Sequence, residues 1–288
     1  MGKLILGTVQ FGLDYGISNN QGKPSKERVH TILDEAFSSG IGLLDTAEAY
    51  GNSEELIGHY LEENSDKHFD IATKFHLSNE VSVASKVRDA LKRLSVDTLE
   101  VIMFHSYQDY LTHADSINAL IELKSKGLLN HIGVSVYTNQ EVEHLLSVPE
   151  VSQIQVPFNL LDNDSQRGVL LRRAHDAGKI VHTRSAFLQG LFFMELDAIP
   201  EHLNQLKGLL GRLQKLCIEN DLSMAELALS YVMNKPYIDG VLIGVHSADQ
   251  LRENIRASLV ALPADLENQI DVLMVENADL LNPGKWKV

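Results

Sequence analysis

Short apolar segments alternate with amphipathic helical patterns along the whole sequence, and no other feature constrains the fold as much. Eight segments have the length and apolar content of buried strands: Leu4–Leu6, Gly42–Asp45, Phe69–Thr73, Leu99–Phe104, His131–Val134, Ser152–Val156, Ile180–Thr183 and Val241–Ile243. Between them, apolar residues recur at spacings of three and four, as on a helix with one buried face. Apolar strands that are each followed by such a helix indicate a parallel sheet covered by helices.

The number of these units favours a closed barrel over an open sheet. Eight strand–helix units in 288 residues fit a (β/α)₈ barrel, whose typical length is about 250 residues. An open, doubly wound sheet that binds a dinucleotide carries Gly-x-Gly-x-x-Gly after its first strand. The sequence there reads Gly7-Thr8-Val9-Gln10-Phe11-Gly12 and lacks that motif. No linker divides the chain, so we predict an α/β fold of the TIM-barrel type, with one domain over residues 1–288.

Composition narrows the classes of partner. The formal net charge of −14 disfavours binding to nucleic acid or to an anionic membrane, because both require basic patches. The single cysteine, Cys217, excludes an internal disulfide and a cysteine-rich metal site, and we expect no metal. The N-terminus has no apolar core of a secretion signal, and no apolar run reaches the roughly 20 residues of a membrane span. We therefore expect a cytoplasmic protein; the oligomeric state is left open.

Four titratable side chains follow neighbouring strands of the predicted barrel. Asp45 ends the second strand, Tyr50 lies in the loop after it, Lys74 follows the third strand and His105 follows the fourth. Each alone has an ordinary structural explanation, such as a turn cap or a solvated loop residue. In a (β/α)₈ barrel, however, the active site is built at the carboxyl ends of the strands. The sequence therefore predicts that all four side chains meet at one rim.

These four residue types suit the reduction of a carbonyl group. Hydride addition to a carbonyl leaves an alkoxide that needs a proton, and Tyr50 is the candidate donor. We expect Lys74 to lie against the phenol and lower its pKa, with Asp45 holding the lysine charged and oriented. His105 is expected to donate a hydrogen bond to the carbonyl oxygen and to fix its position.

The motifs around these residues resemble those of the aldo-keto reductase family. The stretch from Gly42 to Glu54 is similar to the family signature Asp-Thr-Ala-x-x-Tyr-Gly-x-Ser-Glu, and Thr73-Lys74 and Phe104-His105 resemble its other active-site segments. The resemblance covers essentially the whole chain. It implies a catalytic set of Asp45, Tyr50, Lys74 and His105, and a nicotinamide cofactor, NADP(H) or NAD(H), bound without a Rossmann motif.

The same resemblance implies a set of cofactor contacts. Ser135 and Gln153 match the ligands of the carboxamide, and Arg184 stands where many relatives stack an aromatic ring on the nicotinamide. The segment after Leu188 resembles a loop over the pyrophosphate, and the segment after Gly244 approaches the adenosine phosphate. The full set of expected cofactor residues is Thr8, Ser135, Gln153, Arg184, Ser185, Leu188, Gly190, Gly244, His246, Ser247, Gln250 and Asn254.

Two further expectations concern specificity. The segment after Gly244 has no fixed cation close to His246, with Arg252 and Arg256 further along the same helix. We therefore expect only weak discrimination between NADPH and NADH. Ser106 follows His105 where many relatives place a tryptophan, and this favours a polar carbonyl substrate such as a sugar derivative.

Two other functions fit the same barrel. Lys74 would be the nucleophile of a Schiff-base aldolase or lyase. Alternatively, the chain would be a sensor or interaction subunit that binds nicotinamide cofactor without turning over substrate.

Overall fold

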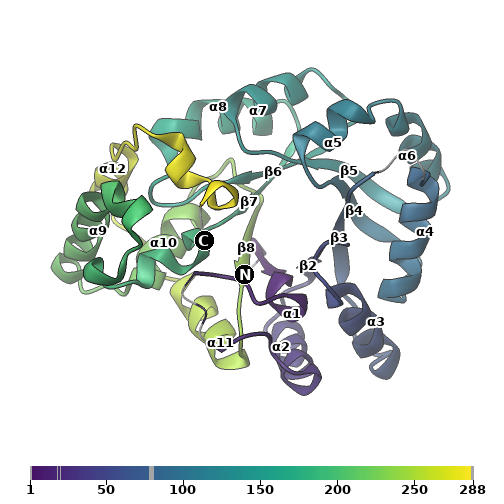
Figure 1. The fold of residues 1–288 in the computed structure, drawn as a ribbon, viewed down its shortest axis with the longest axis horizontal. Coiled ribbons are helices and arrows are strands. Elements are labelled where there is room, and N and C mark those ends of the chain that lie inside the picture. The colour runs from purple at the N-terminus through teal and green to yellow at the C-terminus, as the bar shows by residue number, and fades with distance from the viewer. Residues whose placement is uncertain (1, 18, 20, 78–80, 287–288) are drawn as a thin grey trace.

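The computed structural model describes residues 2–17, 19, 21–77 and 81–286. Within them, eight parallel strands close into a barrel in the order β1-β2-β3-β4-β5-β6-β7-β8, as Figure 1 shows. The strands are β1 (Leu4–Gly7), β2 (Leu43–Asp45), β3 (Asp70–Phe75), β4 (Leu99–Phe104), β5 (Leu129–Ser135), β6 (Gln153–Pro157), β7 (Ile180–Arg184) and β8 (Gly240–Gly244). The predicted fold class and all eight predicted strands are confirmed, with bounds that differ by at most two residues.

Helices surround the barrel, and polar caps fix where several of them begin. The helices are α1 (Val9–Gly12), α2 (Lys26–Ser38), α3 (Ser53–Glu63), α4 (Val83–Leu94), α5 (Tyr107–Thr112), α6 (Ser116–Ser125), α7 (Asn139–Leu146), α8 (Asp164–Asp176), α9 (Lys207–Glu219), α10 (Met224–Met233), α11 (Ala248–Ala257) and α12 (Ala264–Asp271). Thr138 and Ser223 form capping boxes at the starts of α7 and α10. Such a cap satisfies backbone N–H groups that would otherwise lack a partner.

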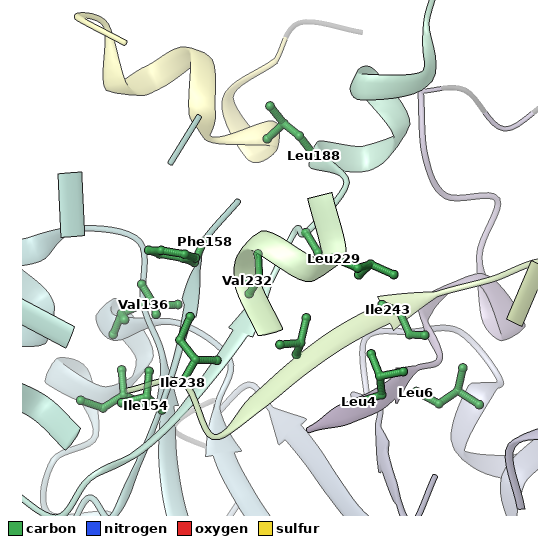
Figure 2. Packing of buried hydrophobic residues seen from close by; sticks show 14 of the residues in the cluster. Leu4, Leu6, Val136, Ile154, Phe158, Leu188, Leu229, Val232, Ile238 and Ile243 are labelled. Atoms are coloured by element: carbon green, nitrogen blue, oxygen red, sulfur yellow. The ribbon is translucent and has the colours of Figure 1, made fainter. Parts of the chain in front are cut away.

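The hydrophobic core lies between the strands and the helices. It contains buried side chains from Leu4 near one end of the chain to Trp286 near the other. Figure 2 shows Leu229 and Val232 of α10 packed beside the strands, with Leu188 among the labelled core residues. Inside the barrel, Ala72, Val101 and Met103 form a separate small cluster. The barrel is therefore a packed structure, and open space is confined to its rim.

Residues at the carboxyl ends of adjacent strands are in register. Gly7 of β1 pairs with Asp45 of β2 and with Gly244 of β8, and each of these three residues ends its strand. The loops that follow β1, β2 and β8 consequently start at one level. Two 3₁₀ segments extend the rim: η1 (Leu188–Phe193) after β7, and η5 (Pro283–Lys285) near the C-terminus.

Helices α3 and α4 approach closely at Gly58, which gives a test of the packing. A Cβ atom on Gly58 would lie 2.1 Å from the Arg93 carbonyl oxygen, so Gly58→Ala should lower the free energy of unfolding by about 1–3 kcal/mol. Gly208 of α9 has no atom within 4 Å of such a Cβ, and Gly208→Ala should leave stability unchanged or raise it slightly. Urea denaturation of both variants measures this. Equal stabilities of the two variants would contradict the packing argument.

Candidate active site

A cavity of about 620 Å³ opens at the carboxyl ends of the strands. All four predicted catalytic residues line it: Asp45, Tyr50, Lys74 and His105. Its volume lies within the range of small-molecule and cofactor sites, about 300–1,000 Å³. The structure thus brings together, from three neighbouring strand ends, the groups that the sequence predicted to meet.

A buried ion pair lies at the floor of the cavity. The Lys74 ammonium is 2.5 Å from Oδ1 of Asp45 and donates a second hydrogen bond to the Thr46 carbonyl at 3.1 Å. Gln155 of β6 donates to the other carboxylate oxygen, Oδ2, at 2.7 Å. All three side chains are almost completely buried. Burial lowers the pKa of Lys74, and the contact with Asp45 opposes this shift.

The proton affinity of Tyr50 differs from the expectation. Lys74 Nζ lies 5.4 Å from the centroid of the Tyr50 ring, while its strong contacts go to Asp45 and Thr46. Burial raises the pKa of Tyr50, and the negative charge of Asp45 raises it further. The predicted lowering of this pKa by Lys74 is therefore wrong for this structure, because the ammonium is engaged by the carboxylate. Tyr50 keeps its proton at neutral pH.

His105 is held as a neutral imidazole. Burial lowers its pKa to about 3, and the nearby positive charge of Lys74 acts in the same direction. The His76 ring stacks on it with centroids 4.5 Å apart and an interplanar angle of 12°. His76 is in turn 2.7 Å from Asp109. A stacked ring anchored in this way fixes the plane of His105, so its nitrogens point in fixed directions.

Other residues of the signature stretch hold the loops in place. Ser53 donates to the Thr8 carbonyl at 3.0 Å and contacts the Thr8 hydroxyl at 2.8 Å, which ties α3 to the end of β1. Glu54 accepts hydrogen bonds from Thr73 and from Arg93, both at 2.6 Å. These contacts join the ends of β1 and β3 to the start of α3, next to the loop that carries Tyr50.

Most of the expected cofactor residues line the cavity. They are Thr8, Ser135, Arg184, Ser185, Gly190, Gly244, His246, Gln250 and Asn254. Two others do not: Leu188 is fully buried in the core, and Ser247 caps α11 by accepting from the Gln250 backbone N–H. Both support the loops that carry the lining residues.

The third exception, Gln153, is a correction. Its side chain lies inside the barrel, 2.9 Å from His182, and is absent from the cavity lining. Gln155 lines the cavity instead. The two residues point to the same side of β6 because side chains alternate along a strand, and Gln155 lies nearer the carboxyl end. The order of the two residues along the strand was therefore a usable signal in the sequence, since the rim residue is the later of the two.

Unusual backbone geometry shapes the loop after β7. Ser185, Leu188 and Gln189 have φ values of 62°, 46° and 55°, and Gly190 has 92°. Residues other than glycine seldom adopt this left-handed region, and such strain is concentrated at functional sites. Tyr15, from the loop after α1, accepts a hydrogen bond from Gln189 at 2.9 Å. The two loops therefore form one wall of the cavity.

Buried polar atoms without partners indicate that this cavity holds a polar ligand. Among the described residues, five buried side-chain atoms lack a hydrogen bond: Gln10 Oε1, His30 Nε2, His105 Nδ1, Gln155 Oε1 and His246 Nδ1. All of these residues except His30 line the cavity. Because unsatisfied buried polar groups are costly, the lining fits a large ligand with hydrogen-bonding groups along its length, as a nicotinamide dinucleotide has.

Two expectations about specificity change with the structure. The Ser106 hydroxyl is bonded to Asp109 and does not contribute to the cavity lining, so it is not the polar wall that the sequence suggested. Arg252 is paired with both Glu35 and Asp249, which neutralise it. Burial also lowers the pKa of His246, so this side chain is uncharged near neutral pH.

In the described part of the chain, no helix is long and apolar enough to cross a membrane. Among the same residues, no group of three or more histidine, cysteine, aspartate or glutamate side chains is placed to hold a metal ion.

Comparisons with known proteins agree with this geometry. Residues 3–274 match the model of the Aldo/keto reductase family. The chain is 28% identical to an NADH-specific methylglyoxal reductase of Escherichia coli K12, covering 88% of each chain. It is 25% identical to an L-glyceraldehyde 3-phosphate reductase of E. coli O157:H7, covering 85% of this chain and 83% of the other. An aldo-keto reductase structure from Bacillus halodurans in its holo form superposes with a TM-score of 0.76 at 22% identity, covering 99% and 95%.

The lowered pKa of His105 predicts how stability depends on pH. The folded protein binds this proton only near pH 3, whereas the unfolded chain binds it near 6.5, so acidification below 6.5 favours unfolding. In His105→Gln, the stability lost between pH 7 and pH 5 should be smaller than in the wild type by about 1–2 kcal/mol. Urea denaturation at several pH values measures it. The exposed His68 supplies the control: His68→Gln should keep the wild-type pH dependence. If the free energy of unfolding of His105→Gln depended on pH as in the wild type, the lowered pKa of His105 would be contradicted.

Proposed function

The chain belongs to the aldo/keto reductase family and is an NAD(P)H-dependent oxidoreductase; on that premise, we propose that its cavity reduces a small aldehyde or ketone to the alcohol. The observation that carries the proposal is the meeting of Asp45, Tyr50, Lys74 and His105 in one cavity. Four titratable groups of different types in one cleft, two of them with strongly shifted pKa values, are typical of a catalytic site.

Tyr50 is the proposed proton donor. A bound NAD(P)H supplies the hydride, and the carbonyl oxygen then needs a proton. The raised pKa of Tyr50 keeps that proton available at neutral pH. An alkoxide is far more basic than a phenolate, so transfer from the phenol is favourable even when the phenol is a weak acid.

His105 and the ion pair position the reacting groups. With its low pKa, His105 is a neutral hydrogen-bond donor at neutral pH. It can therefore hold a carbonyl oxygen while Tyr50 remains the group that gives up a proton. Asp45 fixes the Lys74 ammonium at 2.5 Å and leaves it little freedom. Because the Asp45 and Thr46 oxygens occupy two of the three ammonium donors, Lys74 is poorly placed to become a free amine nucleophile. This geometry disfavours the Schiff-base aldolase.

The cavity residues divide into a cofactor end and a substrate end. Ser135, Gln155 and Ser185 would hold the carboxamide end of the cofactor, and Gly244, His246, Gln250 and Asn254 the adenosine end. The outer wall of the cavity carries the polar side chains of Tyr15, Asn19, Gln21 and Gln189. Two relatives are named for small oxygenated carbonyls, methylglyoxal and glyceraldehyde 3-phosphate. We therefore propose a short, polar aldehyde, such as a sugar-like compound, as the substrate class.

Replacing Tyr50 by phenylalanine removes only the phenol. The Tyr50→Phe variant should lose roughly 10²–10⁴-fold in kcat for aldehyde reduction, while its NADPH dissociation constant stays within about threefold of the wild-type value. Tyr110 is buried outside the cavity, so Tyr110→Phe should retain activity. Steady-state oxidation of NADPH with glyceraldehyde measures both. Turnover in Tyr50→Phe close to wild type would contradict the role of Tyr50. A wild type that binds NADPH yet reduces no aldehyde would favour the sensor function.

The cofactor preference should be weak near neutral pH, because Arg252 is neutralised and His246 is uncharged. We expect kcat/KM for NADPH and NADH to agree within about tenfold at pH 7.5, with the preference for NADPH growing as the pH falls below 6.5 and His246 becomes protonated. His246→Arg should increase the preference for NADPH at pH 7.5. A wild-type preference above about a hundredfold at pH 7.5, roughly 2.7 kcal/mol, would show that another cation binds the 2′-phosphate.

A further inference from the structure

Arg184 places a fixed positive charge inside the cavity. It ends β7, and its Nη2 donates a hydrogen bond to the Val136 carbonyl at 3.0 Å. The guanidinium carbon lies 4.0 Å from the centroid of the Tyr137 ring, so one face of the group is covered by the aromatic ring. These two contacts orient the guanidinium. In the described part of the chain, Nε and Nη1 make no hydrogen bond to another side chain or carbonyl.

The charge of Arg184 is not matched by a nearby acid in the described part of the chain, where no carboxylate forms an ion pair with it. Asp45 is engaged by Lys74 and Gln155, and Asp162 is engaged by two nitrogens of Arg167, at 2.5 and 2.8 Å. The other acid that lines the cavity, Glu253, is on α11, among the residues assigned to the adenosine end. Arg184 is half-buried, and removing a cation from water without a counter-ion costs free energy. A binding site for an anion explains why the charge is placed here.

This charge acts at the reacting end of the cavity. Burial is the largest cause of the pKa shifts of Tyr50, Lys74 and His105, and in all three the Arg184 charge also lowers the pKa. A charge felt by all three groups is close to the place where a substrate carbonyl would be held. The residues assigned to the adenosine end, from Gly244 to Asn254, follow β8 instead.

We propose that Arg184 is an anion subsite for the substrate, which binds a carboxylate or phosphate carried by the same molecule whose carbonyl lies at Tyr50 and His105. The inference rests on the proposed function and narrows its substrate class to short anionic aldehydes or ketones. A guanidinium suits this task because its planar donors match the oxygens of either group in a bidentate contact. The stack on Tyr137 keeps that plane oriented before the substrate arrives.

Matched pairs of substrates test the charge directly. The pairs are succinic semialdehyde against butanal, and glyceraldehyde 3-phosphate against glyceraldehyde. In the wild type, we expect kcat/KM to be at least about tenfold higher for the anionic member of each pair. In Arg184→Gln, the ratio of kcat/KM for the anionic member to kcat/KM for the neutral member of each pair should fall about 10- to 100-fold, chiefly through KM for the anionic member. Arg184→Lys should retain part of the preference because it keeps the charge.

Two controls separate a substrate role from other roles. Arg173 is an exposed arginine of α8 paired with Glu143, and Arg173→Gln should behave as wild type. Arg184 was also expected among the cofactor residues, so NADPH binding to Arg184→Gln is measured by the fluorescence of the cofactor; a substrate role predicts that it weakens less than the binding of the anionic substrates does. Equal losses for charged and neutral substrates, together with weaker NADPH binding, would overturn the proposal and make Arg184 a cofactor ligand. Equal wild-type rates within both pairs would overturn it as well.

A binding measurement keeps this inference separate from the proposed reaction. Titration of 4-hydroxybutyrate into the complex with NADP⁺, followed by calorimetry, requires no turnover, with 1-butanol as the uncharged comparison. Binding of 4-hydroxybutyrate to the wild type, and its loss in Arg184→Gln, would support the anion subsite even if no aldehyde were reduced. Failure of the wild type to bind the anion more tightly than 1-butanol would overturn it.

Discussion

The buried ion pair between Asp45 and Lys74 is the interaction on which the rest of the site depends. Two charges in a low-dielectric interior are stable only when each is matched and hydrogen-bonded. Here the second carboxylate oxygen is held by Gln155 and the ammonium by the Thr46 carbonyl. The pair therefore joins β2, β3 and β6 at the level where the loops begin. Burial is the main cause of the raised pKa of Tyr50 and of the lowered pKa of His105; the negative member of the pair adds to the first shift and the positive member to the second.

The fold was largely predictable because the same sequence pattern, an apolar strand followed by an amphipathic helix, is repeated along the chain. Each strand is a short apolar run bounded by turn residues, and a helix with one apolar face follows, so an error at one boundary does not affect the others. The four titratable residues were predictable for the same reason. Once the strands are in place, the geometry of a barrel brings their carboxyl ends to one rim. The positions of Asp45 and Lys74 near the ends of adjacent strands were enough to predict that they meet in the site.

Contacts between side chains were the part that the sequence did not reveal. Whether Lys74 turns toward Asp45 or toward the Tyr50 hydroxyl depends on ångström-scale placement, and the structure gives the carboxylate the closer contact. The hydroxyl of Ser106 and the guanidinium of Arg252 both have nearby acids that engage them, which spacing alone does not show. Gln155 differs: its position nearer the carboxyl end of β6 was enough to distinguish it from Gln153, whose side chain pairs with His182 inside the barrel.

The reacting residues lie on strands and the outer wall of the cavity lies on loops, and this difference affects which parts of the cavity can change in sequence. Asp45, Lys74 and Gln155 are on strands, where a shift in backbone would disturb the whole barrel. The outer wall, by contrast, comes from separate segments: the loop that carries Tyr15, the turn that carries Gln189, and Pro283 near the C-terminus. The first two are joined by the hydrogen bond from Gln189 to Tyr15, so they form one unit that is separate from the strands. Natural variation or laboratory evolution is therefore free to remodel the entrance, while the inherited reaction machinery beneath it stays intact.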